Sequence, residues 1–451
     1  MTATTGTTPT LPPSGSGMFR GLGLVATTAL VVGNMIGSGI YVIPSSLAET
    51  AGPLGLVAWA INAAGYLCLT AVFADLGGAY PVSGGLQAFA RRAFGDLVGL
   101  EVGFLYWLCA VIGNAAFLTA FVGYLAVLWP AAGDPWTAFV VSQALLWALT
   151  LTNAIGVRAG GAIQVVTVIC KLAPLVILSV ALWPLASLEH VQPFAPKGWG
   201  SLLPAVSLVS WLFVGMESVT VPAEEIRGAG RTIRKSVYIG FAMTCVVYLL
   251  VLGSLSLAVP AELLAKSASP LADVAAHHFG PTAATLVTVG ALVSVAGILN
   301  GWVLVTSRMA HATARDGLGP RALAQLHPRF GTPTRALVLT AVLSGALVGL
   351  YFSGSTLEIY NFIALLSTAT ALVAIGAACA AQLRLLRREP DRFSPQQHRR
   401  APWTASIGLA VVVLMIAGSG ATIVALTAAC LLLPLPYYFF ALRRRPAGAA
   451  K

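Results

Sequence analysis

The stretch VVGNMIGSGIYVIP, residues 31–44, places three glycines, an asparagine and a serine in the middle of the first long apolar segment. A segment that crosses a lipid bilayer must satisfy its backbone N–H and C=O groups within the protein, so it is normally a continuous helix. A Gly-rich break at that depth survives only where surrounding protein or a water-filled cavity satisfies the freed groups. The stretch therefore predicts a broken helix beside a cavity.

The composition is that of a multi-pass membrane protein. Of the 451 residues, 57% are hydrophobic and only 9% are charged, whereas soluble domains have about 25% charged residues. A spanning helix needs about 20 apolar residues, and twelve segments qualify. We expect them near 22–47, 54–80, 98–130, 136–156, 161–187, 202–222, 236–259, 282–307, 336–353, 359–383, 403–419 and 421–442.

The basic residues predict the topology. With the N-terminus inside, only Lys197 and Lys266 of the 26 Lys and Arg residues fall in outward loops, and Lys171 lies within a span. Basic residues of short loops stay cytoplasmic, so we expect a plasma or inner membrane protein with both termini in the cytoplasm. The net charge of +11 is thus explained by topology, and no nucleic-acid partner is expected.

A second break matches the first. The sixth span contains SWLFVGMES (210–218), in which Gly215 lies beside Glu217. Gly-rich interruptions at corresponding places in two halves indicate an inverted-repeat transporter. We therefore predict repeats at about 22–187 and 202–383, followed by helices 11 and 12 at about 403–442. The whole transporter domain covers 21–442, between a disordered tail (1–20) and a basic tail (443–451).

The freed amides at Ser38 and Gly39 suit a substrate carboxylate, because a helix N-terminus presents N–H groups and a positive dipole end. The alternative is close helix packing, since Gly33 and Gly37 form a GxxxG pattern. Glu217 is an intramembrane acid, which is typical of binding or proton movement. Its alternative is a protonated carboxyl bonded to a neighbouring helix.

Three further side chains within spans are candidates for function. Trp211, across the second break, could form a lid, and Trp302 could hold a cation through its ring; both could equally be packing residues. Lys171 lies near the bilayer middle, where desolvation favours proton exchange. Alternatively, it is a permanent charge where another transporter holds sodium.

The connecting segments predict structural elements rather than catalytic or binding sites. PVSGGLQAFARRAFG (81–95) predicts an interfacial or re-entrant helix, and PAEEIRGAGRTIRKS (222–236) predicts a hinge or gate. The six cysteines lie in apolar runs without metal-ligand spacing, so neither a disulfide framework nor a zinc site is expected. The sequence has no P-loop, HExxH or GxSxG motif, so we expect no cofactor and no enzymatic activity.

The ordered motifs GNMIGSGIYVIPSSLA, FADLGGAYPVSGG, FLYWLCAVIGN, WLFVGMESVTVPAEE and RDGLGPRALAQLHPRFGTP resemble the amino acid–polyamine–organocation (APC) superfamily. Within it, the chain is most similar to basic amino acid/polyamine antiporters, and among these to arginine/agmatine antiporters. The resemblance covers residues 20–440 and implies the leucine-transporter-like fold, all-α, with a 5+5 inverted repeat and broken helices 1 and 6. A homodimer fits the family, with spans 11 and 12 as the candidate interface.

The resemblance also implies roles for individual residues. Ser38 and Gly39, in the break that also holds Asn34 and Gly37, would bind the substrate carboxylate through backbone amides. Carbonyls of Met35, Trp211 and Val214 would bind its amino group, and Trp211 would close over it. Trp302 would stack on a guanidinium head. The remaining residues would surround that head or form an inner gate: Cys109, Ala110, Asn114 and Ser367 for the head, and Tyr106 with Glu217 for the gate.

Three positions depart from the antiporter pattern. Ile375 stands in place of a gating tyrosine on helix 10, and Phe117 in place of a methionine near the side-chain pocket. Lys171 resembles instead the helix-5 lysine of proton-responsive or neutral amino acid carriers.

We therefore expect a secondary transporter that exchanges a cationic amino acid such as arginine for its decarboxylated amine, such as agmatine. The alternatives are a proton-coupled symporter or uniporter of neutral amino acids that uses Lys171, and an amino acid sensor without transport.

Overall fold

The computed structural model describes residues 22–155, 160–265, 267–352 and 355–442. The two predicted tails, 1–20 and 443–451, therefore lie outside the described residues. In the part that is described, all regular structure is helical, with one isolated bridge between Leu22 and Ile226. This confirms the all-helical class expected from the apolar runs.

Ten helical segments are long and apolar enough to cross a membrane in the described ranges. Two further apolar segments, Trp199–Ser210 and Thr334–Leu350, are shorter. They correspond to the expected spans at 202–222 and 336–353. The sixth segment is short because its helix stops at Ser210, where the predicted break begins.

The first half of the chain contains the broken helix and its neighbours. Its helices are α1 (Leu24–Met35), α2 (Ser38–Thr50), α3 (Gly55–Ala79), α4 (Leu86–Phe94), α5 (Asp96–Leu128), α6 (Pro135–Ile155) and α7 (Gly160–Leu182). The break between α1 and α2 falls at Ile36 and Gly37, within GNMIGSG. The helix expected within 81–95 is α4.

The second half repeats the alternation of long helices and short connectors. Its helices are α8 (Leu202–Ser210), α9 (Ala229–Ala258), α10 (Ala261–Leu264), α11 (Pro270–Phe279), α12 (Pro281–Arg315), α13 (Thr334–Leu347) and α14 (Thr356–Arg388), followed by α15 (Pro395–Ala417), α16 (Ala421–Leu432) and α17 (Leu435–Tyr437). After α8 the chain turns through 211–215 and continues as a 3₁₀-helix, Met216–Thr220.

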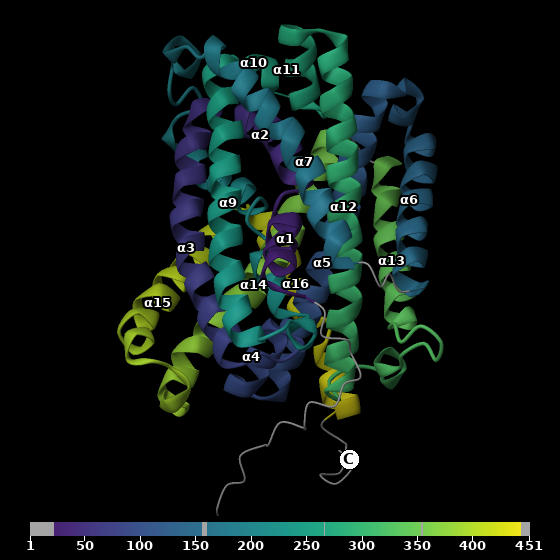
Figure 1. Ribbon diagram of the computed structural model, residues 1–451, viewed down its shortest axis with the longest axis vertical. Helices are drawn as coiled ribbons and strands as arrows, with labels where there is room; N and C mark the ends of the chain where they lie inside the picture. The colour runs from purple at the N-terminus through teal and green to yellow at the C-terminus, as the bar shows by residue number, and fades with distance from the viewer. Residues whose placement is uncertain (1–21, 156–159, 266, 353–354, 443–451) are drawn as a thin grey trace, which may run out of the picture.

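The helices form an upright bundle in which α4 lies at one end and α10 and α11 at the other (Figure 1). We call these the α4 end and the α11 end. Helix α5 packs along both α12 and α14, and α1 packs against α7 and α9. In the most apolar stretch of the broken segment Leu24–Thr50, 94% of the residues are buried, compared with 22% in that of Pro135–Ile155. The interrupted helix is therefore the centre of the bundle.

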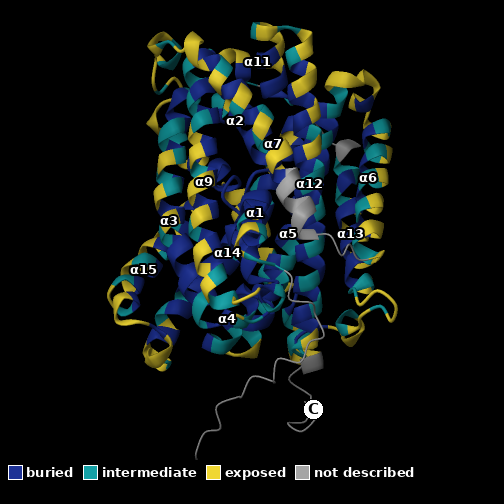
Figure 2. Cartoon of the chain, viewed as in Figure 1, coloured by how far each residue is buried: buried dark blue, intermediate teal, exposed yellow. Residues whose placement is uncertain are grey.

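The outer helices expose apolar side chains. On α6, Val140, Trp147 and Leu151 are exposed, and Figure 2 shows exposed residues along the outside of the bundle around a buried interior. Large exposed apolar surfaces are rare on soluble monomers and are expected where lipid is the neighbour. The protein is therefore a multi-pass membrane protein.

Candidate functional site

A narrow cavity lies where the two helix breaks meet α5, α12 and α14. Its walls nearly meet, and the space left between the lining side chains has a volume of about 10 Å³. The lining contains nine of the predicted site residues: Asn34, Met35, Gly39, Cys109, Ala110, Trp211, Val214, Trp302 and Ser367. It also contains Phe117, which the sequence analysis named as a departure, and Gly113 and Ile298, which it did not name.

The two breaks approach each other closely at Gly215. This glycine has φ of 117°, and a Cβ atom on it would lie 2.5 Å from the backbone oxygen of Asn34. The Asn34 side chain also donates to Ser218 Oγ across 2.8 Å. Glycine is needed here for both its left-handed backbone and its lack of a side chain.

The start of α2 forms one wall of the site. The first N–H groups of a helix have no partner within it, and here Ser38 and Gly39 are the first two residues of α2. Gly39 lines the cavity beside Trp211, whose Cδ1 would lie 3.1 Å from a Cβ at position 39. Gly37 instead serves close packing, since a Cβ there would lie 2.1 Å from Cδ1 of Ile298. The packing alternative for GNMIGSG thus applies at Gly37, and substrate binding at Gly39 stays a prediction.

Glu217 follows the second break and is not in the cavity lining. It is fully buried and accepts a 2.9 Å hydrogen bond from the hydroxyl of Tyr106. Both of its carboxyl oxygens lie within 3.1 Å of the Gly215 amide nitrogen. The acid therefore caps the broken sixth segment and ties it to α5, and the inner gate of Tyr106 and Glu217 stays a prediction.

Trp302 and Asn34 line the cavity, whereas Tyr106 and Asn114, two other predicted site residues, are not in its lining. The Trp302 ring lies 6.0 Å from the Tyr106 ring, and its Nε1 donates to the Asn34 carbonyl across 3.3 Å. Asn114 is buried, and neither its oxygen nor its nitrogen has a hydrogen-bond partner among the described residues. The side-chain oxygen of Asn34 is likewise unpartnered within the described chain. Buried polar atoms without partners are costly, so these amides are suited to a polar ligand.

Ser367 is held against α5. Its hydroxyl donates to the Cys109 carbonyl across 2.7 Å, so its oxygen can still accept hydrogen bonds from other donors. Cys109 Sγ lies 3.5 Å from the same hydroxyl. These two residues therefore form a polar strip between α5 and α14.

Lys171 lies at the first break and not in the cavity lining. Its Nζ donates to the carbonyls of Gly33 and Ile36, each at 2.8 Å. In an unbroken helix the Gly33 carbonyl would accept from residue 37, so the ammonium satisfies an acceptor that the break frees. A cation is also favourable at the C-terminal end of α1, where the helix dipole is negative.

Two tyrosines that the sequence analysis did not identify complete the site. Tyr248 of α9 lies 2.7 Å from the carbonyl oxygens of both Met35 and Leu212, and so joins the two breaks. Tyr360 of α14 accepts from Trp211 Nε1 at 2.8 Å and lies 3.2 Å from Ser38 Oγ. Ile375, one of the departures from the antiporter pattern, is buried near the middle of the same helix. The residues next to a tyrosine in a helix do not indicate which distant groups its hydroxyl contacts.

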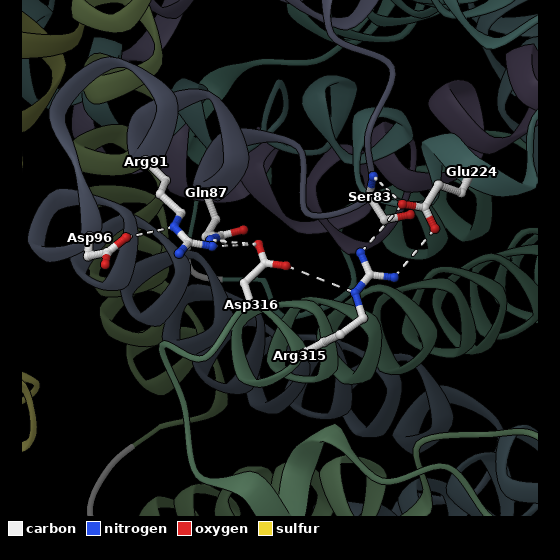
Figure 3. Close-up of polar contacts among 7 residues, drawn as sticks. All are labelled: Ser83, Gln87, Arg91, Asp96, Glu224, Arg315 and Asp316. Atoms are coloured by element: carbon white, nitrogen blue, oxygen red, sulfur yellow. Dashed lines mark hydrogen bonds and ion pairs between the residues drawn. The ribbon is translucent and has the colours of Figure 1, made fainter. Parts of the chain in front are cut away.

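An ionic layer lies at the α4 end (Figure 3). Arg91 pairs with Asp96 at 2.7 Å and with Asp316 at 3.6 Å. Arg315 lies 3.4 Å from Glu224, whose carboxylate also accepts from the Ser83 amide. Burial raises the pKa of Asp316 above its ordinary value, against the opposing charges of Arg91 and Arg315.

The neighbouring Glu225 accepts two hydrogen bonds from Arg308, at 2.6 and 3.2 Å. The predicted hinge segment 222–236 is thus joined to the C-terminal part of α12 by two charge pairs, and Glu224 also accepts from the Ser83 amide just before α4.

Comparison with known proteins gives the family. The amino acid permease family model matches residues 22–438. An arginine/ornithine antiporter of Pseudomonas aeruginosa is 31% identical over 416 residues, covering 86% of this chain and 84% of its own. A cadaverine/lysine antiporter of Escherichia coli is 29% identical over 331 residues, covering 72% of this chain and 74% of its own. The chain belongs to the amino acid permease family of the APC superfamily, and it is a transporter and not an enzyme.

Proposed function

We propose that the protein exchanges a cationic amino acid such as arginine for its decarboxylated amine, such as agmatine, by alternating access. The observation that carries the proposal is the cavity at the two breaks, which is lined by Gly39 of a helix N-terminus, by Trp302 and by Asn34, whose side-chain oxygen has no partner among the described residues. The relatives' names support a cationic substrate, since they pair arginine with ornithine and lysine with cadaverine.

The carboxylate end of the substrate would bind at Ser38 and Gly39. Backbone N–H groups at a helix N-terminus bind anions by hydrogen bonding and by the dipole. The amino group would contact carbonyls at the breaks, where Met35 keeps a free lone pair beside its bond from Tyr248. Gly39 lies in the cavity wall, within reach of such a ligand.

The cationic end would lie against Trp302. The interaction of a cation with an indole face contributes about 0.5–2 kcal/mol of binding free energy, and the contribution is larger where water is excluded. Asn114 and Ser367 would add acceptor oxygens around a guanidinium or ammonium group.

Alternating access needs a barrier on each side of the substrate. Tyr360 with Trp211 forms a barrier toward the α11 end, and Tyr106 with Glu217 forms one toward the α4 end. We propose that the α4 end is cytoplasmic, because the basic connectors lie there. This proposal also includes twelve spans, a 5+5 inverted repeat and a homodimer formed through α15 and α16.

Exchange can be measured in proteoliposomes. Uptake of labelled arginine should rise when agmatine, ornithine or cadaverine is loaded inside, and should be low into empty vesicles. Equal uptake into empty vesicles under a proton gradient would contradict exchange. Binding of arginine without any flux would indicate a sensor.

A second candidate function is supported by Lys171. A buried ammonium bonded to the freed carbonyls of the first break could couple substrate binding to protonation in a symporter or uniporter of neutral amino acids. Lys171→Ala should then abolish the pH dependence of leucine or alanine uptake while leaving binding measurable. If Lys171 is only a fixed cap, the variant should lose stability and transport together at every pH.

A further inference from the structure

The hydroxyl of Tyr360 joins the lid of the cavity to the first residue of α2. The side chain is 1% exposed and lies about one turn from the start of α14 at Thr356. The next residue, Asn361, accepts a 2.6 Å hydrogen bond from Ser46 Oγ of α2. Two successive residues of α14 thus contact α2, and this fixes where the Tyr360 hydroxyl lies.

The partners of Tyr360 determine the direction of its proton. The indole N–H of Trp211 can only donate, so the phenol oxygen is the acceptor of that 2.8 Å bond. The remaining partner is Ser38 Oγ at 3.2 Å. With its oxygen accepting from Trp211, the phenol can donate its proton toward Ser38. This arrangement places an O–H donor beside the free amides of the α2 N-terminus.

We propose that Tyr360 determines specificity by donating a hydrogen bond to the substrate carboxylate, and so distinguishes an amino acid from its decarboxylated amine. The inference rests on the proposed function, because it takes the carboxylate position at Ser38 and Gly39 from it. A carboxylate there is a stronger acceptor than the serine hydroxyl, since charge-assisted hydrogen bonds are about twice as strong as neutral ones. The phenol proton therefore turns from Ser38 to the ligand.

The amine cannot use this donor. It has no carboxylate, so with the amine bound Tyr360 keeps its bond to Ser38 and gains nothing. The same hydroxyl also contacts the lid, because it accepts a hydrogen bond from the indole N–H of Trp211. An amino acid thus binds with a hydrogen bond to the outer barrier, and an amine binds without one.

The test compares Tyr360→Phe with the wild type in competition binding. The ligands are paired, arginine with agmatine and lysine with cadaverine. Loss of a hydrogen bond to a charged group should raise the Kd of the amino acid by about tenfold and leave the Kd of the amine unchanged. The ratio of the two Kd values is the readout, because a general disturbance of the cavity would move both alike.

A matched control removes another buried hydroxyl of the bundle. Tyr124 of α5 donates to the Tyr41 carbonyl at 2.7 Å, whereas the partners of Tyr360 are Trp211 and Ser38. Tyr124→Phe should leave the ratio unchanged. Tyr360→His, which returns an N–H donor to the position, should recover part of the preference for the amino acid and guards against a misfolded Phe variant.

If Tyr360→Phe weakened the binding of amino acid and amine equally, the inference would be overturned and Tyr360 would have only a structural role. Failure of the proposed function has a different signature, in which wild-type protein binds leucine but neither arginine nor lysine. The ratio is then measured with leucine and 3-methylbutylamine, which differ by the same carboxylate. Absence of amino acid binding altogether would overturn both proposals.

Discussion

The ring and the indole N–H of Trp302 make two different contacts. The N–H donates to the Asn34 carbonyl at the first break, and this fixes the plane of the ring. The ring lines the cavity with Tyr106 behind it. A residue held in this way can present its face to a cation without paying further rotamer entropy on binding.

Removal of the Trp302 ring should therefore weaken cationic ligands most. Trp302→Ala is expected to raise the Kd for arginine by about tenfold or more, since it loses the cation–π interaction and ligand packing. The matched control is Trp147→Ala on α6, which removes an exposed indole from the outside of the bundle. Competition by leucine or alanine, with none by arginine, would contradict the assignment of Trp302 to a cationic head.

At the scale of elements, the two breaks depend on each other. Asn34 bonds to Ser218, Tyr248 bridges the carbonyls of Met35 and Leu212, and Glu217 caps the Gly215 amide. The two breaks are thus joined to each other, and Tyr248 and Glu217 satisfy part of the backbone that they free. Buried N–H and C=O groups without partners cost about 1–3 kcal/mol each, so the breaks depend on these contacts.

Gly215→Ala tests this mutual dependence. The added Cβ would meet the Asn34 oxygen at 2.5 Å and force a left-handed φ on alanine. We expect a loss of about 1–3 kcal/mol, seen as a lower melting temperature together with loss of exchange. Gly253→Ala in α9 is the control, since a Cβ there meets nothing within 4 Å. A Gly215→Ala protein with normal stability and transport would show that the close approach is dispensable.

At the scale of the whole molecule, the two barriers that we propose differ in their chemistry. The proposed barrier toward the α11 end is a buried chain of Tyr360, Trp211 and Ser38, whereas the one toward the α4 end is the Tyr106–Glu217 hydrogen bond together with the charge pairs at that end. Charge pairs near a surface contribute little stability singly. They separate at low cost when the segment 222–236 moves, which suits a gate.

Breaking one pair should favour opening of the α4 end. Glu225→Gln removes the charge that Arg308 contacts at 2.6 Å, and Cys109 in the cavity lining is the reporter. In a background whose other cysteines are replaced by serine, Cys109 should react severalfold faster with an impermeant maleimide applied from the α4 end. Arg387→Gln, an exposed arginine of α14, is the control. An unchanged labelling rate would exclude the Glu225–Arg308 pair from the gate.

The sequence by itself determined the membrane class, the all-helical fold, the family and the first break. These follow from local patterns: apolar run length, the position of glycines and the ordered motifs. Asn34, Gly39, Trp211 and Trp302 were found in the same way, because a break or a ring at membrane depth is visible in the chain.

Only the tertiary structure decided which groups meet across the breaks. Tyr360 lies 322 residues from Ser38, and Tyr248 lies 213 residues from Met35. Their neighbours in the chain are ordinary apolar helix. The same holds for Gly37, whose packing against Ile298 depends on how α12 crosses α2. A hydrogen bond between distant helices is fixed by their packing, so its partners acquire their roles only when the bundle forms.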